Sequence, residues 1–160
     1  MRQTTLLITL ALGLATGPVL SACGEGNKGL VGSKCDIISC AYDRIDCQFY
    51  RTPDDNAVIH YKRVLEEGER WTAKIIVGLD GADLDALKDG LTFEEQEFLD
   101  RVMLQRPGEL EQWGDFHGNR CNLKLSAPED GADLSGKCSF AFDDGMFLTA
   151  RFGCSVELIE

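Results

Sequence analysis

The clearest pattern in the chain is an alternation of apolar and polar side chains near its carboxyl end. Within residues 134–142, and again within 146–158, almost every second side chain is apolar. A period of two residues is typical of a β-strand with one buried face. Asp143, Asp144 and Gly145 separate the two runs and are typical of a tight hairpin turn. The two strands are expected to share one buried face, made of Cys138, Phe140, Phe142, Met146, Leu148, Ala150, Phe152, Cys154 and Val156.

Shorter runs with the same period occur at residues 41–49, 57–64, 71–79 and 121–125. Polar turn residues separate the first three runs, which is the spacing of an antiparallel meander. The sequence therefore predicts a mainly β protein: a single antiparallel β-sandwich or flattened barrel of about seven to eight strands, with one short helix, over residues 34–160.

The stretch 92–106 carries two conflicting signals. Thr92 and Glu95 have the spacing of a capping box, which favours a helix. Val102 and Leu104 alternate with polar or flexible side chains, which suits a strand equally well. We expect a short helical turn near residues 93–97, followed by a strand near residues 99–106.

The amino-terminal stretch has the features of an export signal. Arg2 supplies a positive start, and residues 6–20 form an apolar run. Fifteen residues at ~1.5 Å each fall short of a ~30 Å hydrocarbon core, so the run fits a signal peptide better than a transmembrane helix. The amino-terminal stretch ends in Leu20, Ser21, Ala22 and Cys23, which resemble the lipobox of bacterial lipoproteins.

The resemblance to lipoproteins implies that residues 1–22 are a signal peptide cleaved between Ala22 and Cys23. The Cys23 thiol would carry a diacylglyceryl group and the new amine a further acyl chain such as palmitate, which together give an effectively permanent membrane anchor. Gly24 in the next position implies the outer membrane of a Gram-negative bacterium. An ordinary secretory leader, with an incidental Cys23, is the alternative.

Beyond the signal peptide, residues 23–33 are rich in glycine and are predicted to be a flexible, lipidated tether. The rest of the chain loosely resembles small β-rich lipoproteins of deltaproteobacteria. The resemblance lies in a first strand with the sequence Tyr42, Asp43, Arg44, Ile45 and in the hairpin over 134–153. It favours the β interpretation and implies no activity.

The chain is strongly acidic, with 16 basic and 27 acidic residues and a formal net charge of −11. Such a charge makes nucleic acid an unsuitable partner, and it opposes binding to an anionic membrane surface through the protein's own charge. The membrane partner is therefore expected to be reached through the lipid anchor. The composition does not identify a protein partner.

Six of the seven cysteines remain if Cys23 is lipidated. An even number in an exported chain predicts three disulfides. Zinc is the alternative, but no Cys-x-x-Cys motif occurs, and His60 and His117 lie far apart in sequence. The set is Cys35, Cys40, Cys47, Cys121, Cys138 and Cys154.

A strand register predicts one of the pairings. If residues 126–133 join two antiparallel strands, Leu125 faces Leu134, and Cys121 then faces Cys138 on the same side of the sheet. The other four cysteines share two bonds whose order stays open. The matching inward phase of Cys47 and Cys154 suggests that these two form a pair.

The sequence Asp-Gly-Ala-Asp-Leu occurs twice, and it places Asp80 with Asp83 and Asp130 with Asp133. Aspartates in glycine-containing loops can bind Ca²⁺, which prefers hard oxygen ligands. The EF-hand spacing is absent, however, and Asp-Gly is also ordinary turn chemistry. We favour turns, keep the four aspartates as weak calcium candidates, and predict no cofactor.

Trp113, Phe116 and His117 form an aromatic-rich segment that is a candidate ligand patch, because aromatic faces stack on ligands. The alternative is a loop that caps one end of the core. No Gly-x-Ser-x-Gly elbow or Walker loop occurs, so no catalytic residue is predicted.

Two functional hypotheses follow. The first is a non-enzymatic envelope lipoprotein that acts as a binding or interaction module. The second is a small periplasmic hydrolase, or a carrier of lipophilic ligands, with a cleft between the sheets. A filled core favours the first hypothesis, and an apolar cavity with a buried acid or histidine favours the second.

Overall fold

The computed structural model describes residues 29–36, 40–51, 55–107 and 116–160, without the side chains of residues 36, 82 and 116–118. The leader, Cys23 and Trp113 lie outside the described residues. The elements are β1 (Gly29–Val31), the 3₁₀ turn η1 (Ser33–Asp36), β2 (Arg44–Tyr50), β3 (Asn56–Leu65), β4 (Gly68–Gly78), α1 (Gly81–Ala86), β5 (Leu91–Glu94), α2 (Glu95–Arg101), β6 (Val102–Gln105), β7 (Phe116–Leu125), β8 (Asp133–Phe142) and β9 (Phe147–Ile159).

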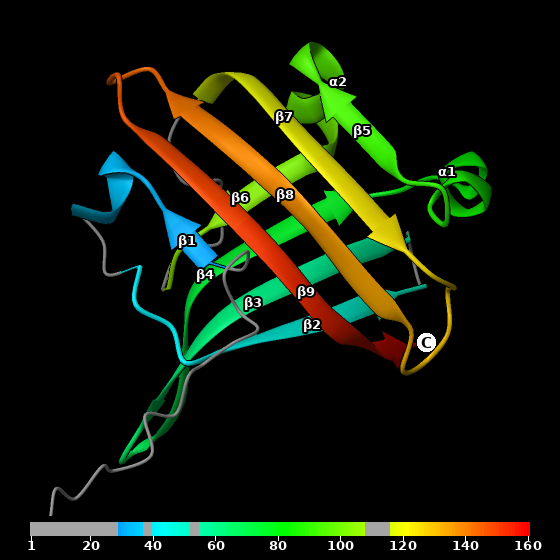
Figure 1. Ribbon diagram of the computed structural model, residues 1–160, viewed down its shortest axis with the longest axis horizontal. Coiled ribbons are helices and arrows are strands. Elements are labelled where there is room, and N and C mark those ends of the chain that lie inside the picture. The colour runs from blue at the N-terminus through cyan, green and yellow to red at the C-terminus, as the bar shows by residue number, and fades with distance from the viewer. Residues whose placement is uncertain (1–28, 37–39, 52–54, 108–115) are drawn as a thin grey trace, which may run out of the picture.

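The described strands form a single sheet that curls back on itself. Its strand order is β5-β7-β8-β9-β2-β3-β4-β6, and β1 pairs separately with β9. In Figure 1 the strands β7, β8 and β9 form a front layer that crosses the layer of β2, β3, β4 and β6 behind it. The predicted mainly β fold, a flattened barrel, is confirmed, and the described part contains nine strands.

Strand β9 belongs to both layers. Residues 147–155 of its thirteen-residue length pair with β8, whereas its end pairs with β2, from Cys47 opposite Val156 to Tyr50 opposite Ile159. The β2–β9 pairing is parallel, while the other described pairs are antiparallel. The expectation of a purely antiparallel sheet is therefore wrong at this junction, because alternation fixes the face of a side chain and not the direction of the neighbouring strand.

Side chains fill the space between the layers. The alternating apolar positions of the strands point into this space, so the strands bury their shared face as predicted. The Tyr61 hydroxyl, which needs a partner in this apolar setting, donates a hydrogen bond to the carbonyl oxygen of Arg151 across the layers at 2.8 Å. The largest fully buried side chains are Tyr61, Phe49, Phe93, Phe98, Phe140, Phe142, Ile59, Ile75, Leu87, Leu104, Leu123 and Leu125.

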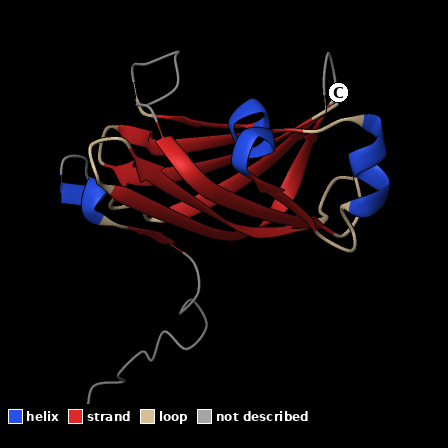
Figure 2. Ribbon diagram, turned by 90° about the horizontal axis from the view of Figure 1, so that it is seen from above, coloured by secondary structure: helices blue, strands red, loops and turns tan. Residues whose placement is uncertain are grey.

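Helix α2 bridges the two ends of the curled sheet. It connects β5 directly to β6, the strands at opposite ends of the strand order. Phe98, fully buried on its inner side, meets Phe140 of β8 edge to face, with ring centroids 5.5 Å apart. Figure 2 shows the helix lying against the sheet away from both ends of the barrel.

The structure resolves the ambiguous stretch 92–106 into both predicted kinds of element, displaced along the chain. The helix covers residues 95–101 instead of 93–97, and the strand covers residues 102–105. A further short strand, β5, precedes the helix and was not predicted, because Thr92 and Glu95 indicated a helix start there. Phe93 in this strand is buried, so tertiary packing outweighed the local signal.

The predicted tether ends earlier than expected. Residues 29–31 form β1, which pairs with β9 from Gly29 opposite Arg151 to Val31 opposite Thr149. Leu30 is buried in the core, which a glycine-rich composition did not indicate. The domain therefore includes residues 29–33, and the boundary at residue 34 is corrected.

The turn after β1 is clamped to the β8–β9 hairpin. Lys34 is only 8% exposed, and its Nζ lies 2.6 Å from Asp144 Oδ2 and 4.3 Å from the centroid of the Phe142 ring. The backbone N–H of Phe147 donates a hydrogen bond to Ser33 Oγ at 3.0 Å. An ion pair, a cation–π contact and a hydrogen bond thus hold the first described residues against a hairpin more than a hundred positions away.

Three disulfides join cysteines of the described residues. Cys121 is joined to Cys138, its direct partner in the β7–β8 register, which matches the predicted pairing. Cys47 is joined to Cys154, which ties β2 to β9 next to their parallel ladder. The remaining bond joins Cys35 to Cys40.

The buried aromatic contact of α2 yields a stability prediction. Phe98→Ala should lower the free energy of unfolding by about 3–5 kcal/mol, because it leaves a cavity between the helix and β8. Leu99→Ala is the matched control, since Leu99 is 40% exposed in the same helix and should change stability by less than about 1 kcal/mol. Urea unfolding with the disulfides intact measures both values. Equal losses would contradict the role assigned to the helix.

The Lys34–Asp144 clamp predicts a pH dependence. The hydrogen bond from Lys34, followed by that from the Met146 backbone N–H, lowers the pKa of the Asp144 carboxyl below its ordinary value. A carboxyl whose pKa is lowered by folding stabilises the fold above its unfolded pKa, and this contribution is lost as the pH falls through the folded pKa.

Denaturant unfolding between pH 6 and pH 2 therefore should show Asp144→Asn less stable than the parent at pH 6, with the difference in stability narrowing as the pH falls toward 2. Lys34→Met should reduce the same pH-dependent difference, because it removes the largest cause of the lowered pKa. A constant gap between parent and Asp144→Asn across this range would refute the clamp.

Candidate functional site

Helix α1 lies at one end of the barrel, opposite to η1 (Figure 2). Its start is fixed by two reciprocal hydrogen bonds: the Asp80 backbone N–H donates to Asp83 Oδ2 at 2.8 Å, and the Asp83 N–H donates to Asp80 Oδ1 at 3.1 Å. Arg101, the last residue of α2, contacts both carboxylates, with Nη1 2.7 Å from Asp83 and Nη2 3.0 Å from Asp80. The first Asp-Gly-Ala-Asp-Leu sequence thus caps a helix and holds an arginine.

The second copy of that sequence is a turn. Asp130 Oδ1 accepts a hydrogen bond from the Leu158 backbone N–H at 3.1 Å, and the Asp133 backbone N–H donates to Ser126 Oγ at 3.0 Å. Within the described residues, no group of three or more His, Cys, Asp or Glu side chains is arranged to hold a metal ion. The carboxylates of Asp80, Asp83 and Asp130 thus make structural contacts, and the calcium-candidate role of the four aspartates stays a prediction.

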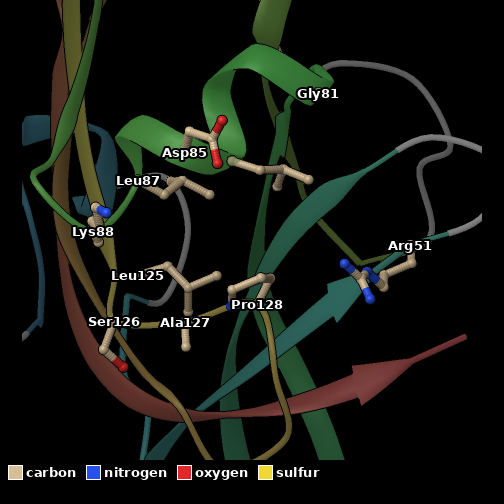
Figure 3. Close-up of a pocket in the computed structure, with 10 residues that line it drawn as sticks. Arg51, Gly81, Asp85, Leu87, Lys88, Leu125, Ser126, Ala127 and Pro128 are labelled. Carbon is tan, nitrogen blue, oxygen red and sulfur yellow. The ribbon is translucent and has the colours of Figure 1, made fainter.

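A pocket of about 370 Å³ opens between α1, the loop after β7 and the end of β2 (Figure 3). Its position follows from local packing: the Leu125 backbone N–H donates to the Leu87 carbonyl at 3.1 Å, which ties the residue after α1 to the end of β7. The described lining residues are Arg51, Gly81, Leu84, Asp85, Leu87, Lys88, Leu125, Ser126, Ala127 and Pro128.

The pocket combines an apolar wall with a charged rim. Leucine, alanine and proline side chains form the wall. Arg51, Asp85 and Lys88 form the rim, and Figure 3 shows Arg51 on the side facing Pro128, away from α1. The rim therefore has one more positive than negative charge, in a chain whose net charge is −11. Such an arrangement suits a small molecule that has an apolar part and an anionic group.

Among the described lining residues, no nucleophile is paired with a base. Neither histidine nor cysteine occurs among these residues, and the one carboxylate, Asp85, lies at the exposed rim. The Ser126 hydroxyl oxygen accepts a hydrogen bond from the backbone N–H of Asp133, and no base is paired with this hydroxyl among the described lining residues. The apolar wall and charged rim of the pocket suit the binding of a ligand.

His60 lies elsewhere, on the outer side of β3. It stands opposite Asp46 in the β2–β3 register and opposite Lys74 in the β3–β4 register. Burial, and then the positive charges of Lys74 and Lys62, lower the pKa of the imidazole. Asp46 contacts Lys62 at 2.5 Å, so the nearby carboxylate is engaged by an ammonium group and does not orient the histidine.

The predicted aromatic patch is only partly visible. Trp113 lies outside the described residues, and the backbones of Phe116 and His117 begin β7, opposite Phe142 and Ala141, with their side chains outside the description. The patch accordingly stays a prediction. The pocket beside α1 was missed because Arg51 and Leu84 are far apart in sequence, and no local motif joins them.

No helix among the described residues is both long enough and apolar enough to span a bilayer. No protein-family model, curated protein or solved structure matches the chain. Its function is therefore inferred from its own residues and geometry.

Proposed function

We propose that the chain is a lipid-anchored protein of the bacterial cell envelope, located at the outer membrane, whose folded domain is a non-enzymatic binding module. The pattern Leu20, Ser21, Ala22, Cys23 carries the anchor part of this proposal. The three disulfides support an oxidising compartment, since such bonds are rare in the cytosol.

The filled interior supports binding at the surface over catalysis or transport within the barrel. Bulky aromatic side chains, including Phe49, Phe93 and Phe140, occupy the space between the layers. A carrier of lipophilic ligands needs an apolar cavity there, and a hydrolase needs a buried acid or base with access to substrate. The described interior favours neither function.

The pocket beside α1 is the binding site that the described residues support best. Its volume of about 370 Å³ lies in the range of small-molecule sites. The wall formed by Leu84, Leu87 and Leu125 would take an apolar group, and Arg51 and Lys88 would attract a carboxylate at the mouth. We assign small amphipathic carboxylates as its ligand class.

Replacement of the anchoring cysteine tests the first part of the proposal. Cys23→Ser should leave an uncut precursor that lacks lipid, because signal peptidase II acts on the lipidated cysteine. Mass spectrometry and detergent partition of the protein from the native envelope measure this outcome. Normal processing and membrane partition of the variant would eliminate Cys23 as the anchor.

Titration with octanoate as a probe tests the pocket. Binding should shift backbone amide resonances of residues 84–88 and 125–127, and Leu84→Asp should weaken it about tenfold or more, since it places a carboxylate on the apolar wall. Leu99→Asp is the control, because Leu99 is exposed on α2, away from the pocket. Equal effects of both variants, or shifts confined to other residues, would show that the pocket is not the site.

A further inference from the structure

One outward surface of this acidic protein carries a group of basic side chains at its centre, although exposed carboxylates, including Asp133 and Glu157, lie on the same strands. Strands β7, β8 and β9 turn their alternate side chains outward, and four of these are basic and exposed. The outward surface of this layer faces the viewer in Figure 1. We call it the basic face; its cations are Arg120, Lys124, Lys137 and Arg151.

The central cations of the basic face repel one another. Lys137 and Arg151 stand directly opposite each other in the β8–β9 register. Among the described residues, neither they nor Lys124 form an ion pair, while Arg120 contacts Glu94 at the sheet edge, at 3.1 Å. Like charges in directly opposed positions destabilise a sheet, so this pair does not serve the fold.

The positions between the cations are polar. Asn122, Ser135, Ser139 and Thr149 share the outward side of the same strands. These side chains can donate hydrogen bonds, and they lack the aromatic and aliphatic bulk that forms the centre of most protein–protein interfaces. The composition fits an extended surface that presents many anionic oxygens.

Two exposed apolar side chains adjoin the basic face at the hairpin end. Phe147 of β9 is 51% exposed and Val31 of β1 is 57% exposed. Val31 stands opposite Thr149, and Phe147 is two positions before Thr149, so both side chains point outward with the cations. Cations beside exposed aromatic and aliphatic side chains are typical of proteins that lie on a membrane surface.

The position of β1 relates this face to the proposed anchor. Gly29, the first residue of β1, stands opposite Arg151. Only five residues separate it from Cys23, and a chain of that length reaches at most ~20 Å. A lipid on Cys23 would therefore hold the strand edge that borders the basic face close to the bilayer.

We infer that the basic face, with Phe147 and Val31, rests on an anionic phospholipid surface beside the lipid anchor. This inference rests on the proposed anchor for the orientation of the domain. The net charge of −11 opposes attraction at long range, whereas the basic face acts at short range, where its cations meet the lipid, and the anchor adds proximity to this local attraction. Each cation near such a surface strengthens binding about fivefold.

Vesicle co-sedimentation tests the inference without any contribution from the anchor. The chain from residue 23 onward, carrying Cys23→Ser, is mixed at low ionic strength with phosphatidylglycerol-containing vesicles or with pure phosphatidylcholine vesicles. The parent should bind the anionic vesicles only. Lys137→Glu with Arg151→Glu should weaken this binding about tenfold or more.

The matched control is Arg63→Glu with Arg70→Glu. These two arginines are exposed and stand opposite each other on the β3–β4 hairpin, so the pair has the same geometry and the same change in charge on the other layer. This control should retain most of the binding. Lys137→Gln with Arg151→Gln removes the repulsion, so it should raise the melting temperature while still weakening binding; this variant guards against a folding artefact.

Each remaining outcome bears on the inference. Equal weakening by both reversed pairs would attribute binding to net charge alone and would overturn it. Absence of parent binding, or binding to dextran sulfate without binding to vesicles, would also overturn it. Failure of the proposed anchor is seen separately, as normal membrane partition of Cys23→Ser in cells, and leaves the vesicle result unaffected.

Discussion

The fold depends on one strand that serves two layers. Strand β9 pairs with β8 along most of its length and with β2 at its end, so one continuous backbone carries the hydrogen bonds of both layers. The Cys47–Cys154 disulfide and the Tyr61 hydrogen bond to the Arg151 carbonyl act across the same junction. Without β9 the sheet would divide into two sheets, each with an exposed apolar face and an unpaired edge.

Alternation of apolar and polar residues predicted the strands well where one face is buried. The long runs that became β8 and β9 follow this rule, and the loop between Leu125 and Leu134 fixed the register that brings Cys121 opposite Cys138. Met146 is only partly buried, because it lies in the hairpin turn before β9 begins. The same alternation could not reveal the parallel β2–β9 pairing, since it contains no information about which strands become neighbours.

Short elements were predicted less well because their structure depends on distant partners. Leu30 and Phe93 are buried apolar residues of three- and four-residue strands, too short to show a period. Helix α1 begins in a sequence that reads as a turn, and its first residues are held by Arg101 from another helix. Neither the pocket nor the basic face could be predicted, because each is assembled from strands and loops whose adjacency only the fold supplies.

The disulfides would have a mechanical consequence for the domain if its amino end is anchored as proposed. A pull on the chain before Gly29 would load the three-residue β1 ladder first, and then the Lys34–Asp144 clamp. The Cys35–Cys40 bond closes a covalent loop, so the residues between these two cysteines would not extend under the pull. Unravelling would end at Cys47, which is covalently joined to β9. The barrel beyond that bond would keep its shape under tension while the preceding segment extends. The amino-terminal part of the domain would then act as a tether whose length the Cys47–Cys154 bond limits.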